Sequence, residues 1–145
     1  MTVISLDRKN AAVYVALKAA EPGIDGVRIS ILSSWPGYIS ELKLQVEENL
    51  VKLGAYYFWT GPANLVIQKD DFPGKRKWYA PWKRHLIRFK GSHISFYPIF
   101  NVDVIRGTRN DILWLDWPEK LNDGQYHTLV NSIKPGGILV ESHDG

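Results

Sequence analysis

The sequence predicts an α/β domain with an open, mostly parallel sheet and helices on both faces. Residues 111–115 form an apolar segment whose composition suits a strand buried on both faces. A short connection and a Gly-Gly turn lead to a second apolar segment at residues 134–141, which is typical of a β-α-β crossover. Helical and strand-like segments also alternate along the chain. An α+β sandwich of the ferredoxin or nitrogen-regulator type is the alternative.

Length and composition indicate one domain spanning residues 1–145. The chain is 45% hydrophobic, and a domain of this size buries roughly 70% of its unfolded surface. It has no cysteine, which excludes disulfides, thiolate zinc sites and a catalytic thiol. No apolar run approaches the roughly 18 residues of a membrane span, and residues 1–9 do not resemble a secretion signal. We therefore expect a cytoplasmic protein without a membrane partner. The four histidines lack metal-ligand spacing, so no metal site is expected.

The first half of the chain is expected to hold two helices and a strand. Asp7 is a suitable N-cap for a helix over residues 11–20, and the β-branched residues at 27–32 predict a strand. A turn at 33–37 precedes a helix over 39–53, which Gly54 ends. That helix carries an apolar stripe at three- and four-residue steps, formed by Ile39, Leu42, Val46, Leu50 and Leu53.

The second half holds several short strand-like segments, at residues 55–59, 65–67, 93–97 and 102–105. Residues 69–92 lie among them and carry prolines at positions 73 and 81. We expect this stretch to be an irregular arm, because proline interrupts both helices and central strands. The crossover at residues 111–141 completes the predicted sheet.

Asp116 follows the strand at 111–115, at the carboxyl edge where open α/β sheets bind their ligands. Its neighbours Leu115 and Trp117 are apolar, and desolvation there would raise the pKa of the carboxyl and suit it to act as a general base. The alternative is that Asp116 caps a helix beginning at Pro118. Gly-Lys-Ser/Thr phosphate loops and Ser-His-Asp arrangements are absent from the sequence.

The predicted arm is strongly basic. No acidic residue lies between Phe72 and Val102, and this stretch holds seven of the eighteen Lys and Arg residues. Aromatic side chains lie among the cationic ones in it, which favours contact with single-stranded nucleic acid through stacking and phosphate pairing. A solvated arm whose tryptophans anchor it to the domain or to another subunit is the alternative. The candidate nucleic-acid contacts are Lys75, Arg76, Lys77, Trp78, Tyr79, Trp82, Lys83 and Arg84.

Four segments resemble, in order, those of class I S-adenosylmethionine-dependent methyltransferases. Residues 28–37 resemble the first strand and cofactor loop, and residues 102–103 the acid ending the third strand. Residues 111–118 are similar to the fourth strand with its active-site acid, and residues 133–140 to the turn into the fifth. The resemblance implies a Rossmann-like fold, S-adenosylmethionine as cofactor and Asp116 as the catalytic residue. The implied cofactor contacts are Ser33, Ser34, Trp35, Gly37, Asp103 and Trp117.

Three hypotheses follow. The first is a small methyltransferase acting on nucleic acid or a small nucleophile, with the basic arm holding the substrate. The second is a non-catalytic nucleic-acid-binding or regulatory subunit of methyltransferase ancestry, favoured because the loop at 33–37 lacks a Gly-x-Gly run. The alternative to cofactor contacts at these positions is that the segment at 35–37 is only a tight turn and that Asp103 is an ordinary loop carboxylate. The third is an oligomeric α+β sandwich with ligand sites between subunits.

Overall fold

The computed structural model describes residues 1–21, 26–33, 38–54, 59–62, 85–98, 105 and 108–143. They form a seven-stranded sheet in the order β1-β7-β6-β2-β5-β4-β3. Neighbours from β1 to β5 in this order pair in parallel, while β4 and β3 are antiparallel additions. The predicted mostly parallel α/β fold is confirmed. The strands are β1 (Thr2–Leu6), β2 (Arg28–Ser33), β3 (Trp59–Pro62), β4 (His85–Phe89), β5 (Ser92–Pro98), β6 (Asn110–Asp116) and β7 (Ile133–Ser142).

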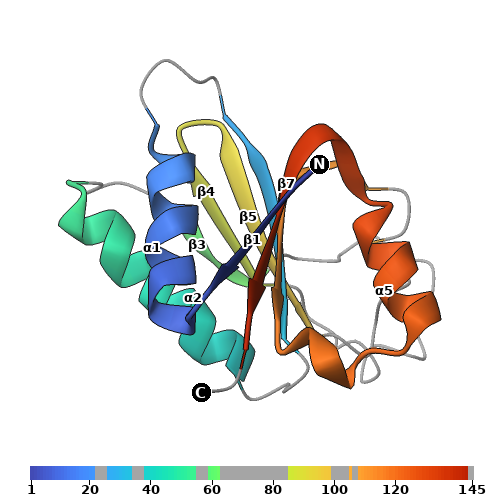
Figure 1. The fold of residues 1–145 in the computed structure, drawn as a ribbon. Helices are drawn as coiled ribbons and strands as arrows, with labels where there is room; N and C mark the ends of the chain where they lie inside the picture. The colour runs from blue at the N-terminus through green and yellow to red at the C-terminus, as the bar shows by residue number, and fades with distance from the viewer. Residues whose placement is uncertain are drawn as a thin grey trace, which may run out of the picture.

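Helices cover both faces of the sheet (Figure 1). Helices α1 (Arg8–Ala19) and α2 (Tyr38–Lys52) lie on one face, where they contact each other and the sheet through one hydrophobic cluster. Helix α5 (Asp123–Val130) lies on the other face, over a smaller cluster that includes Leu113 and Leu139. The strands between these two layers are buried on both sides, which explains their continuous apolar composition.

The helices of the first half begin and end where local chemistry predicts. The Asp7 carboxylate accepts a hydrogen bond from the Asn10 backbone N–H and caps α1. In α2 the predicted stripe is buried from Ile39 to Leu50, whereas Leu53 follows the helix and is 46% exposed. Gly54 has φ +85°, the left-handed conformation that commonly ends a helix.

The predicted β-α-β crossover is present. Strand β6 leads through a short 3₁₀ helix, η3 (Pro118–Lys120), and α5 to β7, which pairs with β6 in parallel. A capping box between Asn122 and Gln125 fixes the start of α5. The crossover therefore places the ends of β6 and β7 side by side at the carboxyl edge of the sheet.

Three strands were not predicted where they occur. Strand β3 shares only Trp59 with the strand-like segment expected at residues 55–59. Strand β1 is short and lies at one edge of the described sheet, where Val3 is 53% exposed, so its sequence lacks the pattern of a buried strand. Strand β4 falls within the stretch expected to be an irregular arm. It pairs with β5 across Lys90 and Gly91, which have φ values of +48° and +80° and form a tight hairpin turn. Residues 69–84 of the expected arm lie outside the described residues.

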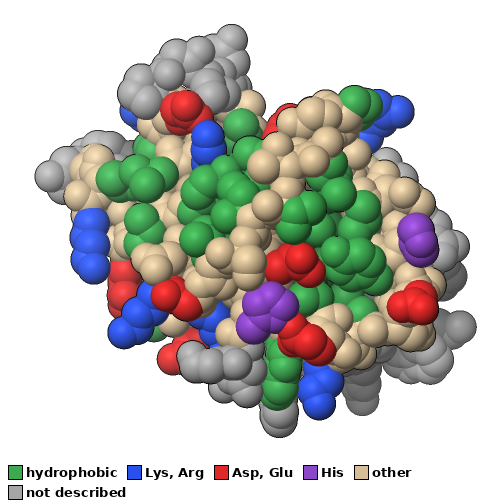
Figure 2. Space-filling view, viewed as in Figure 1, with side chains coloured by type: hydrophobic (Ala, Val, Ile, Leu, Met, Phe, Trp, Pro, Cys, Tyr) green, Lys and Arg blue, Asp and Glu red, His purple; other side chains and the backbone are tan. Residues whose placement is uncertain are grey.

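Hydrophobic side chains gather on the face of the molecule that presents β1 and β7, with charged side chains around them (Figure 2). Two exposed apolar residues belong to this part of the chain: Val3 lies in β1, and Met1 directly precedes the strand. Among the described helices, none has the length and apolar character needed to cross a membrane.

Candidate functional site

The carboxyl edge of the sheet contains a fully buried acid. Asp116 ends β6 and is 0% exposed. It lies between two serines that end the neighbouring strands, because its register partners are Ser33 in β2 and Ser142 in β7. Alternation along β6 points Asp116, like Trp114, to the face that carries α1. The amino end of α1 reaches this edge directly from β1.

Three side chains donate hydrogen bonds to the Asp116 carboxylate. Ser33 Oγ donates to Oδ2 at 2.7 Å, while Ser142 Oγ and Arg8 Nε donate to Oδ1 at 2.8 and 2.6 Å. Trp114 Nε1 in turn donates to Ser142 Oγ at 2.7 Å. These five residues, Arg8, Ser33, Trp114, Asp116 and Ser142, form what we call the Asp116 network. Short hydrogen bonds to a charged acceptor are strong, so the network holds the carboxylate in one position.

Arg8 reaches Asp116 because β1 and α1 are joined by a single residue, Asp7. Arg8 is the first residue of α1, and its side chain is 19% exposed. The amino end of a helix is a natural site for an anion. Here the Asp7 carboxylate already occupies it, bound to the backbone and side-chain nitrogens of Asn10 at 2.7 and 2.9 Å.

A cavity of about 370 Å³ lies beside the network. Its charges balance, because Arg8 and Lys9 are offset by Asp7 and Glu41. Asp116 is not among the described residues that line it. A site for a polyanion needs an excess of positive charge, and this cavity does not supply one. The described lining consists of Asp7, Arg8, Lys9, Glu41, Leu42, Gln45 and His143.

The structure brings together two of the predicted site residues, Ser33 and Asp116. The apolar surroundings predicted for Asp116 are wrong, because a guanidinium and two hydroxyls bind its carboxylate. The alternative, Asp116 as a helix cap, is not observed either: the N-cap of η3 is Trp117, with no side-chain hydrogen bond.

Trp117, a predicted cofactor contact, is half-buried at φ +61°, and Lys120 Nζ lies 4.9 Å from the centre of its ring. Lys120 thus covers the ring that was expected to contact a ligand. The other predicted cofactor contacts, Ser34, Trp35, Gly37 and Asp103, lie outside the described residues. So do the eight predicted nucleic-acid contacts of the arm, Lys75, Arg76, Lys77, Trp78, Tyr79, Trp82, Lys83 and Arg84.

Sequence reasoning missed Arg8 and Ser142. Without β1, nothing in the sequence places the start of α1 at the carboxyl edge, so Arg8 cannot be paired with Asp116. Ser142 follows the expected strand by one residue, and β7 extends to include it. One signal in the sequence could have identified Arg8, namely its position directly after the N-cap Asp7. An arginine in the first turn of a helix interacts unfavourably with the helix dipole, which indicates that an acid nearby compensates its charge.

No protein-family model matches the chain, and no curated protein matches it either. Solved structures do match. A large terminase from a thermophilic bacteriophage, in complex with ADP, is 11% identical, with a TM-score of 0.56 over 98% of this chain and 33% of its own. The same terminase in complex with ATP-γ-S is 10% identical, with a TM-score of 0.53 over 97% and 32%.

The large terminase ATPase domain of Thermus phage P74-26 is 15% identical, with a TM-score of 0.54 over 97% of this chain and 59% of its own. The chain therefore spans about a third of the first terminase and somewhat over half of the Thermus phage domain. At these identities the likeness shows the fold.

The methyltransferase activity predicted from the sequence is wrong, and so is the S-adenosylmethionine cofactor. The solved structures described above, which share the fold, are terminases, two of them bound to ADP or ATP-γ-S. The non-catalytic hypothesis of methyltransferase ancestry is overturned by the same finding. The physical reason lies in Asp116, the predicted base, whose two oxygens are both bound by side chains of the protein. The described residues thus have an α/β fold similar to that of part of the large terminases, and the acid at the carboxyl edge of the sheet is bound by side chains of the protein itself.

Proposed function

We propose that the chain is a terminase-like domain that works on DNA and does not itself turn over ATP. The observation that carries this proposal is the Asp116 network at the carboxyl edge of a sheet shared with terminase ATPase domains. The role on DNA comes from the large terminases that share the fold. It agrees with the cytoplasmic location expected from the sequence.

The case against ATP turnover begins with the β1–α1 connection. P-loop enzymes hold the phosphates of ATP on backbone N–H groups of a glycine-rich loop with a lysine, between a strand and a helix. The only residue between β1 and α1 is Asp7, whose carboxylate occupies the amino end of the helix. A phosphate there would meet a negative charge instead of a cradle of donors.

The second argument concerns Asp116. A strand-end aspartate of P-loop enzymes holds the magnesium ion that accompanies the nucleotide. Both Asp116 oxygens are bound by protein donors, and the Arg8 guanidinium supplies the compensating positive charge. The described residues at this edge therefore do not fit magnesium and ATP, and we derive no hydrolytic step for them.

The test measures ATP hydrolysis by the purified chain, alone and with DNA. We expect no turnover above that of the Asp116→Asn variant, and no protection against thermal unfolding from millimolar Mg-ATP. Turnover that Asp116→Asn abolishes would overturn the proposal. Arg8→Gln is the matched second variant, because it removes the guanidinium that binds Asp116 and leaves the Asp116 carboxylate in place.

The nucleic-acid contact rests on the basic arm. The aromatic and cationic residues at 75–84 suit single-stranded DNA, since each stacked base contributes about 1 to 3 kcal/mol. We expect labelled single-stranded DNA to bind with an affinity that falls steeply with salt. The Trp78→Ala, Trp82→Ala double variant should lose most of this affinity. Trp114 is buried and is kept in this variant. Equal affinity of wild type and double variant would count against the arm.

The mass of the chain in solution, with and without DNA, tests whether it assembles.

A further inference from the structure

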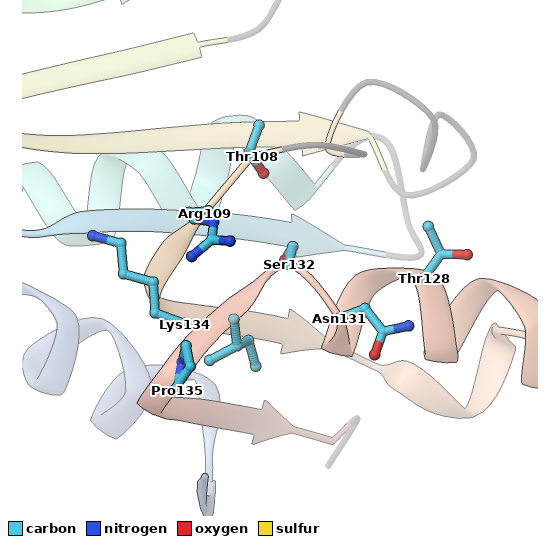
Figure 3. A pocket seen from close by; sticks show the side chains of 8 residues that line it. Thr108, Arg109, Thr128, Asn131, Ser132, Lys134 and Pro135 are labelled. Atoms are coloured by element: carbon cyan, nitrogen blue, oxygen red, sulfur yellow. The ribbon is translucent and has the colours of Figure 1, made fainter.

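Two adjoining cavities lie on the α5 face of the sheet, at the amino ends of β6 and β7, opposite to the Asp116 network. The larger has a volume of about 670 Å³ and the smaller about 60 Å³, and Thr108 lines both. Figure 3 shows Arg109 and Lys134 at one end of the larger cavity and Thr128 and Asn131 of the α5 end at the other. We call the two cavities together the amino-edge groove.

The groove carries an excess of positive charge. Arg28, Arg109 and Lys134 line it, and Asp111 is the acid beside them. Lys134 Nζ lies 3.3 Å from Asp111 Oδ1, and the Arg28 backbone N–H donates to Oδ2 at 2.8 Å. Of the three cationic side chains that line the described groove, Lys134 is therefore the one paired with this carboxylate, and the charges of Arg28 and Arg109 add to it. Arg109 is exposed, so its guanidinium is accessible to a ligand from solvent.

The floor of the groove is polar and fixed. Asn110 is fully buried, and it accepts a hydrogen bond from Ser30 Oγ at 2.6 Å and donates to Ser132 Oγ at 3.1 Å. A buried network of this kind, with its hydrogen bonds made, holds the surrounding side chains in place. Polar floors and cationic rims suit a hydrated anionic ligand better than an apolar one.

The carboxyl end of α5 also borders the groove, and a helix carboxyl end disfavours anions. Here two of its last four carbonyls, those of His127 and Leu129, are already bonded. The Asn131 N–H donates to His127 O at 3.0 Å, and both the N–H and Oγ of Ser132 donate to Leu129 O, at 3.0 and 2.6 Å. Partial neutralisation of these carbonyls leaves the arginine and lysine charges dominant.

We propose that the amino-edge groove binds the phosphodiester backbone of DNA, with Arg109 and Lys134 pairing with successive phosphates. The choice of DNA over another polyphosphate rests on the proposed function. Such contacts give affinity without sequence preference, because phosphates are the same at every base. They also place DNA on the face opposite to the Asp116 network.

The test is fluorescence anisotropy of a labelled short DNA duplex with wild type and the double variant Arg109→Gln, Lys134→Gln. We expect the double variant to bind about tenfold more weakly, with a salt slope smaller by about 2, since each phosphate contact contributes about 0.9. Lys52→Gln in the last turn of α2 is the control for loss of an exposed charge, and we expect less than about a twofold change. A double variant that binds as tightly as Lys52→Gln overturns the inference.

Two further measurements separate the sources of failure. If wild type binds no DNA, the proposed function fails together with the groove. If only Trp78→Ala, Trp82→Ala loses binding, the groove inference fails and the proposed function stands. ATP and tripolyphosphate serve as competitors. If they displace the duplex only at concentrations at which they act as added salt, the result supports binding of the DNA backbone. Tight ATP binding lost in the Arg109, Lys134 variant would overturn the assignment to DNA.

Discussion

At the scale of single residues, Asp116 determines how the carboxyl edge behaves. A carboxylate without exposure to water is stable only when donors and a positive charge replace its hydration. Ser33, Ser142 and Arg8 supply these, and Arg8 is itself mostly buried. The network is therefore mutually dependent, since removing one charged member leaves the other buried without its partner.

Asp116→Ala is expected to lower the free energy of unfolding by about 3 to 5 kcal/mol, the cost of leaving a buried charge uncompensated. Urea denaturation followed by circular dichroism measures it. Glu21→Gln is the control, because it removes an exposed partner of Lys18, 3.6 Å away, and we expect a loss under about 1 kcal/mol. Similar losses in the two variants would show that the network is not a buried ion pair in solution.

Tyr126 gives a pH-dependent prediction. Burial raises the pKa of its phenol above the ordinary 10.0, and the nearby Glu141 carboxylate, 3.5 Å from the hydroxyl, raises it further. The folded state thus keeps the proton to higher pH than the unfolded state. The resulting stability is fully present below about pH 10 and is lost as the pH rises through the folded pKa.

Tyr126→Phe should therefore show a shallower loss of stability than wild type as the pH rises above about 10. Urea midpoints across this range measure the difference. Below about pH 9 the two proteins should have parallel pH profiles, since a tyrosine phenol stays protonated there in both the folded and the unfolded state. A variant with the same alkaline slope as wild type would contradict the assignment.

At the scale of elements, the β6–α5–β7 crossover depends on close backbone approach at Gly137. A Cβ atom there would lie 2.9 Å from the backbone oxygens of Asp111 and Lys134 and would also meet the Ile133 side chain. Gly124, within α5, meets only the Asn122 side chain at 3.5 Å. The two glycines thus have opposite effects. At Gly137 there is no space for a side chain, whereas Gly124 has space for one and only lowers the stability of the helix.

Gly137→Ala should destabilise the protein by about 1 to 3 kcal/mol through overpacking against backbone. Gly124→Ala should stabilise it by about 0.5 to 1 kcal/mol, since alanine loses less conformational freedom in a helix. Thermal unfolding of both variants measures these effects with the same chemical change. Equal shifts of the two melting temperatures in the same direction would refute this account of the crossover.

The elements that the sequence predicts well are those whose own pattern matches their environment. The stripe of α2 and the apolar run of β6 each face a core that their sequence already implies. Strand β4 differs, because its neighbours are basic and its strand form depends on pairing with β5 across Lys90 and Gly91. The sequence of β4 alone therefore does not predict a strand, because the strand is stabilised by its pairing with β5.

At the scale of the whole molecule, the candidate site combines four separate segments. Asp116 and Ser33 could be placed at the carboxyl edge, because strand ends in a parallel sheet share one side. Arg8 could not, since its place depends on β1 joining the far side of β7. No local sequence pattern encodes the order of the strands in the sheet. That order determines which side chains bind Asp116, and so the chemistry available at the carboxyl edge.

The position of β1 predicts an association behaviour. Within the described sheet it is an edge strand, and from Thr2 to Leu6 it has no charged or proline residue to discourage pairing with another strand. Val3→Lys should reduce concentration-dependent self-association, measured by sedimentation velocity. Val51→Lys is the matched control, because Val51 on α2 is also 53% exposed, and it should leave association unchanged. A wild type that stays monomeric at high concentration would contradict the prediction.

The single-residue joint at Asp7 has a mechanical consequence. With one residue between β1 and α1, the helix has almost no freedom to swing relative to the strand. Its first residue is bonded to Asp116 on β6, two strands away in the sheet. A force that pulls on the exposed side of α1 would therefore be carried across three strands at once, so the helix and the central sheet should yield together as one stiff unit.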